Sequence, residues 1–259
     1  MTQGTIGLHG GGELIRGDEP FLRAILVEAA TATVARLAAC VPAPADGGRT
    51  IVVVLPVAAG GERPELAVAN ARAALGRIAN ELGMTVQVRV AEVVDRRTAE
   101  DPVAAAMLAG ADLVYLPGGD PERAARALLT SAAGRSLLAA HARGATIAGA
   151  SAGAMALCAW TWTPAGGMPG LGLVPRVAVA PHADRHADEA LADARRRLGG
   201  LAPGIGVIAL DERTGILSGR TAAAGRRWRV VGPGRAAWIA PGATTAIIAR
   251  DGEALVLPG

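Results

Sequence analysis

Residues 145–154 read Ala-Thr-Ile-Ala-Gly-Ala-Ser-Ala-Gly-Ala, and this segment predicts a strand, a sharp turn and a helix. At its centre lies Gly149-Ala150-Ser151-Ala152-Gly153, which has the pattern G-x-S-x-G. The pattern is typical of a nucleophilic serine, because the glycines allow the strained backbone that exposes the hydroxyl. The N–H of the next residue, at the start of the helix, can stabilise an oxyanion. Ser151 is therefore the candidate nucleophile.

The segments around residues 145–154 alternate between strand and helix. Strands are expected at 5–8, 50–56, 85–94 and 112–116, and helices at 20–40, 64–82, 99–109 and 121–142. This alternation predicts an α/β fold with a mostly parallel sheet sandwiched between helices. After Gly170 the chain has short apolar runs separated by Gly and Pro, with one helix expected around 184–198. We therefore expect a strand-rich C-terminal part that completes a single domain over residues 1–259.

The composition predicts a protein that needs no cofactor for stability and binds no nucleic acid. The chain has 259 residues, 51% of them hydrophobic, with 2 Cys and a net charge of +3. A core of this size needs no metal or cofactor for stability. All the basic residues are Arg, and their clusters at 195–197 and 226–227 are short and lack interleaved aromatics, so no nucleic-acid partner is expected.

The expected location follows from the cysteines and the N-terminus. Cys40 and Cys158 lie in separate apolar contexts, and no signal peptide is evident. Cys158 is expected seven residues into the helix that follows Ser151, where it is most simply a core residue. The uncharged segment 145–170 is interrupted by Gly, Pro and Trp, which favours a buried strand–turn–helix over a membrane span. We expect a cytoplasmic protein with no membrane partner, and association into a homodimer is compatible with the sequence.

A serine nucleophile needs a base and an acid. Of the four histidines, His182 is the best placed, because it follows the expected strand at 177–180. The acid is expected in Asp211-Glu212, at the end of another strand, with Asp184 as the alternative nearer in sequence. An α/β-hydrolase would instead use His9-Gly10-Gly11-Gly12 as its oxyanion loop, but that fold needs a histidine near the C-terminus, and none follows His186.

The chain resembles the S51 serine peptidases, a family that includes dipeptidase E and cyanophycinase and has the class I glutamine amidotransferase-like fold. The resemblance extends from Gly10 to about Leu217. It rests on five motifs: Gly10-Gly11-Gly12, Leu116-Pro117-Gly118-Gly119-Asp120, the turn at 149–154, Pro181-His182-Ala183-Asp184-Arg185, and Gly204-Ile205-Gly206 leading to Asp211-Glu212.

The resemblance implies roles for individual residues. It implies a catalytic triad of Ser151, His182 and Glu212, with the N–H groups of Gly119 and Ala152 as oxyanion donors. Gly118 and Asp120 on the same turn are expected to bind substrate. Arg185, close after the base, is a candidate for binding a substrate carboxylate.

The features that bind cyanophycin are missing. Cyanophycinases have Gln after Gly-Gly-Asp and an Asp-Gln-His-Phe run, whereas this chain has Pro121 and Ala180-Pro181-His182-Ala183. Glutaminases of this fold have Cys at the turn where this chain has Ser151. The expected function is therefore a serine exopeptidase-type hydrolase that cleaves a peptide or isopeptide bond in a small, Asp-containing substrate through an acyl-enzyme. The alternatives are a non-catalytic binding or regulatory protein and an α/β-hydrolase-type esterase.

Overall fold

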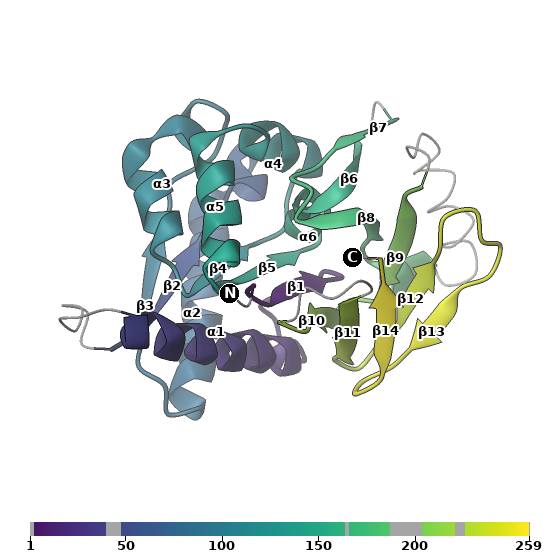
Figure 1. Cartoon of the computed structure of the whole chain (residues 1–259), viewed down its shortest axis with the longest axis horizontal. Helices are drawn as coiled ribbons and strands as arrows, with labels where there is room; N and C mark the ends of the chain where they lie inside the picture. The colour runs from purple at the N-terminus through teal and green to yellow at the C-terminus, as the bar shows by residue number, and fades with distance from the viewer. Residues whose placement is uncertain (1–2, 40–47, 164–165, 187–203, 221–225, 259) are drawn as a thin grey trace.

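The computed structural model describes residues 3–39, 48–163, 166–186, 204–220 and 226–258, which form two β-sheets and their helices (Figure 1). The larger sheet has eight strands in the order β14-β11-β10-β1-β5-β4-β2-β3. Strands β1, β5, β4, β2 and β3 run parallel, and the other three pair antiparallel. Their bounds are β1 (Ile6–His9), β2 (Thr50–Val54), β3 (Val86–Val90), β4 (Leu113–Leu116), β5 (Thr146–Ala150), β10 (Gly215–Ser218), β11 (Arg226–Val231) and β14 (Ala254–Leu257).

Helices cover both faces of the parallel strands (Figure 1). In β2, Val52 and Val54 pack towards α1 (Glu19–Ala39) and α2 (Pro64–Glu81), whereas Ile51 and Val53 pack towards the opposite layer. That layer holds α3 (Pro102–Ala109), α4 (Pro121–Leu128), α5 (Ala132–Ala142) and α6 (Ala152–Leu157). Burial on both faces explains why β2 and β4 read as continuous apolar runs, whereas the edge strand β3 is only partly buried and contains Gln87 and Arg89. The predicted α/β fold is confirmed.

A second sheet of six strands was not predicted as a separate layer. Its order is β13-β12-β9-β8-β6-β7. One core cluster contains Ile216 and Trp228 of the larger sheet together with Val179 and Ile208 of the second, so the two sheets pack against each other. The strands are β6 (Cys158–Thr163), β7 (Gly166–Pro169), β8 (Val174–Ala180), β9 (Gly206–Leu210), β12 (Ala236–Ile239) and β13 (Ile247–Ala249).

The single helix expected over 121–142 is wrong. The structure has two helices, α4 and α5, separated by a turn in which Thr130 has a φ of 57°. Ser131 then caps α5, because its hydroxyl accepts a hydrogen bond of 3.0 Å from the N–H of Gly134. A capping serine satisfies a free N–H at a helix start, and this signal inside an apolar pattern is easily overlooked.

The helix after Ser151 is shorter than expected. Helix α6 has six residues, and Cys158, which was expected inside it, begins β6 instead. Burial raises the pKa of the Cys158 thiol, so it is an inert core group. Of the helix expected around 184–198, the structure describes only a 3-10 turn, η3 (Ala183–His186), and the remainder lies outside the described residues. None of the described helices has the length and apolar character of a membrane span.

Candidate active site

The candidate site lies where strands of the two sheets end. Ser151 follows β5, His182 comes two residues after β8, and Glu212 comes two residues after β9. Strands β1 and β5 are parallel, as are β8 and β9. The carboxyl ends of parallel strands meet at one edge of a sheet, which is the usual position of ligands in α/β folds.

These three side chains form a hydrogen-bonded chain. The Ser151 Oγ lies 3.0 Å from the His182 Nε2, and the His182 Nδ1 lies 2.6 Å from the Glu212 Oε1. The His182 side chain is 31% exposed and that of Glu212 is 13% exposed, so the imidazole is open to a ligand while the acid is mostly enclosed. In this geometry the imidazole can accept the hydroxyl proton while the carboxylate holds its Nδ1–H.

The turn at Ser151 is strained. Ser151 has φ 47° and ψ −114°, a conformation that few non-glycine residues adopt and that costs about 1–3 kcal/mol. The glycines on each side allow α6 to pack tightly against the sheet. A β-carbon at Gly149 would lie 2.6 Å from the backbone of Gly153, and one at Gly153 would lie 2.4 Å from the carbonyl oxygen of Leu116. The G-x-S-x-G pattern therefore has a packing reason at both glycines.

The last residue of β1 and the loop after it hold all three segments in register. Three successive carbonyls of residues 9–11 accept hydrogen bonds from the N–H groups of Ser151 (2.9 Å), His182 (2.7 Å) and Arg213 (2.8 Å). Arg213 is the residue after Glu212. One short segment thus fixes the backbone beside each member of the candidate triad, although sequence reasoning assigned it no such role.

A buried contact between His9 and Asp18 supports this loop. His9 Nε2 lies 2.8 Å from Asp18 Oδ1, and both side chains are 0% exposed. The other Asp18 oxygen accepts a hydrogen bond of 2.8 Å from the N–H of Leu14, and the His9 ring packs on Phe21. The side chain of His9 therefore contacts Asp18 and Phe21, and among the described hydrogen bonds it makes none with Ser151. This geometry does not support the α/β-hydrolase alternative, which assigned His9 to the reaction.

The structure separates the three candidate acids. Asp211 is buried, and its Oδ2 accepts hydrogen bonds from the backbone N–H (2.8 Å) and the Nε (3.2 Å) of Arg235. Asp184 accepts a hydrogen bond of 2.9 Å from the backbone N–H of Glu212. Of these three acids, only Glu212 has a described hydrogen bond with the imidazole of His182.

Two predicted substrate-binding side chains are engaged within the protein. The Arg185 Nη2 lies 2.5 Å from the Glu212 Oε1, the oxygen that also faces His182, although the Arg185 side chain is 63% exposed. The Oδ1 of Asp120 accepts hydrogen bonds from the N–H groups of Glu122 (2.9 Å) and Arg123 (3.1 Å) and thereby caps α4. Asp120 therefore has a structural role that its sequence position before Pro121 could have indicated.

The Gly118-Gly119 turn lies beside Ser151. A β-carbon built on Gly118 would be 3.4 Å from the Ser151 β-carbon. Gly119 has a φ of +142°, and a β-carbon there would lie 2.3 Å from the carbonyl oxygen of Ala58, so this turn has no room for a side chain. Ala152 is the first residue of α6, and the first N–H of a helix has no acceptor within it.

Glu13 is a residue near the site that sequence reasoning missed. Its Oε1 accepts a hydrogen bond of 2.8 Å from the N–H of Gly118. The signal that could have found it is its position directly after the Gly10-Gly11-Gly12 turn, at the carboxyl end of the first strand.

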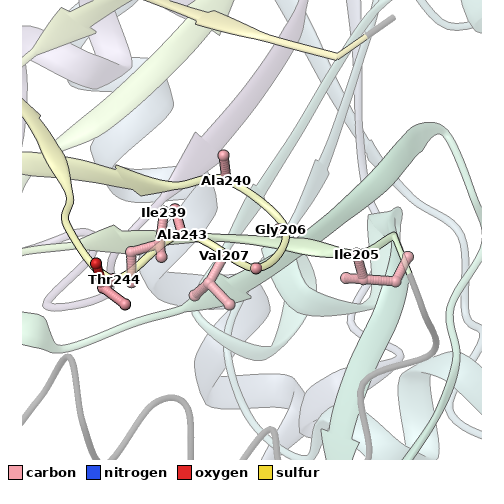
Figure 2. Close-up of a pocket in the computed structure, with 8 residues that line it drawn as sticks. Ile205, Gly206, Val207, Ile239, Ala240, Ala243 and Thr244 are labelled. Carbon is pink, nitrogen blue, oxygen red and sulfur yellow. The ribbon is translucent and has the colours of Figure 1, made fainter.

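An apolar pocket of about 270 Å³ lies elsewhere in the second sheet (Figure 2). It is lined by Gly206 and Val207 at the start of β9 and by Ile239 and Ala243 near the end of β12. Because Glu212 follows the opposite end of β9, this pocket is separate from the candidate site.

Comparisons with known proteins identify the family. The model of peptidase family S51 matches residues 46–223. The chain belongs to peptidase family S51. This membership supports a hydrolase of the peptidase class. No curated protein sequence matches it significantly.

Two solved structures have a similar fold. A peptidase from an acI-B1 Actinobacterium is 23% identical, with a TM-score of 0.75 over 99% of this chain and 98% of that one. A candidate peptidase E from Listeria monocytogenes EGD-e is 14% identical, with a TM-score of 0.52 over 90% of this chain and 100% of that one.

Proposed function

We propose that the protein is a serine-type exopeptidase that cleaves a peptide or isopeptide bond in a small substrate through an acyl-enzyme on Ser151. The observation that carries the proposal is the hydrogen-bonded chain from Ser151 through His182 to Glu212, with distances of 3.0 and 2.6 Å. Within family S51, this chain of contacts favours a serine nucleophile. We also propose that the enzyme is cytoplasmic and acts on small peptides.

The proposed reaction has two halves. The Ser151 hydroxyl attacks the scissile carbonyl while His182 takes its proton and then gives it to the leaving amine. Water attacks the acyl-enzyme, and His182 again carries the proton. The N–H groups of Gly119 and Ala152 are proposed to stabilise the oxyanion, and loss of one such donor typically costs about 3–4 kcal/mol of transition-state stabilisation.

A labelling and substrate experiment tests the proposal. A neutral fluorophosphonate is expected to modify Ser151, located by peptide mass spectrometry. A panel of Asp-X dipeptides, β-aspartyl dipeptides and p-nitrophenyl esters then identifies the scissile bond. Labelling together with cleavage of a dipeptide supports a peptidase, whereas cleavage of esters alone favours an esterase. A protein that is neither labelled nor active favours the binding or regulatory alternative.

Replacement of Gly11 by alanine tests whether the loop after β1 positions His182. Gly11 has a φ of +102°, and a β-carbon there would lie 2.2 Å from the His182 Cε1, so the imidazole must move. Displacement of a catalytic group by about 1 Å costs about a hundredfold in rate, and we expect that loss in the rate of fluorophosphonate labelling.

The matched control is Gly83→Ala. Gly83 also has a positive φ, +66°, but a β-carbon there meets nothing within 4 Å. We expect a lower melting temperature from backbone strain and an unchanged labelling rate. Equal labelling rates in the Gly11 and Gly83 variants would rule out the positioning role.

A further inference from the structure

The carboxylate of Glu13 lies beside the candidate nucleophile. A β-carbon built on Gly118 would be 2.6 Å from the Glu13 Oε1 and 3.4 Å from the Ser151 β-carbon. Both distances are measured from the same point. The Glu13 Oε1 and the Ser151 β-carbon are therefore at most ~6.0 Å apart, which is the sum of the two distances. The α-nitrogen of an acyl group attached to Ser151 would be three bonds from the Oγ. The carboxylate is therefore within reach of a group on the acyl side of the scissile bond.

No ion pair neutralises the charge of Glu13 within the part of the chain that the structure describes. Among the described residues no arginine forms an ion pair with Glu13, and Arg185, which belongs to the same site, is paired with Glu212. The negative charge of Glu13 also acts on a buried side chain. The pKa of Tyr115 is raised well above its usual value, mainly by burial and to a smaller extent by the carboxylates of Glu13 and Asp18. Within the described residues, Glu13 therefore places an unpaired negative charge near the site where an oxyanion would form.

A negative charge in that position opposes the proposed reaction unless a positive charge enters with the substrate. Two negative charges at short distance in a partly enclosed site repel each other strongly. Catalytic sites typically stabilise the developing oxyanion with donors and positive groups. A substrate cation at Glu13 would remove the repulsion and would also bind more tightly in the transition state.

We propose that Glu13 binds a positively charged nitrogen on the acyl part of the substrate. The inference rests on the proposed function, because it takes Ser151 as the nucleophile. The nitrogen is either the α-ammonium of an unblocked N-terminal residue or the basic group of a side chain. An α-ammonium at Glu13 would restrict cleavage to the first peptide bond of a chain, which is the definition of an aminopeptidase-type exopeptidase.

Glu13→Gln separates recognition of charge from support of the turn. A glutamine side-chain oxygen can still accept the hydrogen bond from the Gly118 N–H, but the negative charge is lost. The melting temperature is therefore expected to stay close to that of wild type. Labelling of Ser151 by the neutral fluorophosphonate is expected to be at least as fast as in wild type, because the reagent carries no cation and the repelling charge has been removed. Glu65→Gln, at an exposed position in the first turn of α2, removes the same charge from a side chain that has no described hydrogen bond or ion pair with Ser151 or Gly118, and it is the matched control.

Three 7-amido-4-methylcoumarin substrates that share the same leaving group provide the test. Their acyl parts are Ala, N-acetyl-Ala and N-acetyl-Lys. For wild type and Glu65→Gln we expect kcat/KM to be about tenfold or more higher for one of the cationic substrates than for N-acetyl-Ala. Preference for Ala identifies an α-ammonium, and preference for N-acetyl-Lys identifies a side-chain cation. In Glu13→Gln the preference is expected to fall to about one.

Two results would overturn the inference. If Ser151 is labelled but Glu13→Gln keeps the wild-type preference, or wild type prefers N-acetyl-Ala, then Glu13 does not bind a cation while the proposed function stands. If wild-type Ser151 is neither labelled nor needed for cleavage of any of the three substrates, the proposed function fails and this inference fails with it.

Discussion

Ser151→Ala is expected to lower kcat/KM by about ten-thousandfold or more, because it removes the atom that would form the acyl-enzyme. His182→Ala is expected to lower it to a similar extent, because His182 is the base that the described hydrogen bonds place against the hydroxyl. The two residues act on the same step. The double variant should therefore be no slower than Ser151→Ala alone, which is the behaviour of groups that work as a unit.

The measurement is kcat/KM of the purified single and double variants on the best substrate of the panel. Ser151→Ala should remain folded, since alanine has no larger side chain than serine and keeps the same backbone strain. Thermal unfolding checks this. Losses that simply multiply in the double variant would mean that Ser151 and His182 contribute independently, and the proposed triad would be untenable.

Glu212→Gln is expected to lower kcat by about a thousandfold while the protein stays folded. The Glu212 Oε1 lies 2.6 Å from the His182 Nδ1, and the carboxylate holds the tautomer in which Nε2 faces Ser151. An amide removes the charge that stabilises the imidazolium formed during the reaction. It can also present its NH₂ group to Nδ1, which would favour the wrong tautomer.

Asp184→Asn is the matched control for Glu212→Gln. Asp184 accepts a hydrogen bond from the Glu212 backbone N–H, and asparagine keeps a side-chain oxygen that can accept it. We expect kcat within about threefold of wild type, because the side chain does not contact the imidazole. A large loss in Asp184→Asn with little change in Glu212→Gln would assign the acid role to Asp184 instead.

Much of the fold was predictable because its signals are local. The β-branched run at 50–56 and the turn at 149–153 indicated a buried strand and a strand–turn–helix, and both are present as β2 and as β5 with α6. The errors arose where the local signal was weak. Ser131 caps a new helix inside an apolar pattern, and Cys158 leaves α6 to join a second sheet that packs across the first.

The candidate site was also predictable only where its signals are local. Gly-x-Ser-x-Gly identified Ser151, and a strand end identified His182, because each motif is contained in a few consecutive residues. Sequence reasoning left Asp184, Asp211 and Glu212 open as the acid and did not find Glu13. Choosing among these acids needs side-chain directions and the approach of segments about thirty residues apart in the chain.

The sequence by itself determined the alternation of strands and helices in the parallel part of the sheet, the turn at Ser151 and the membership of a peptidase family. Only the tertiary structure decided which carboxylate meets His182 and which one faces Gly118. The physical reason is that secondary structure follows from periodicity and backbone preference within a short window. Contacts between loop ends depend instead on how two sheets pack and on the carbonyls of residues 9–11, which set the register of three distant segments.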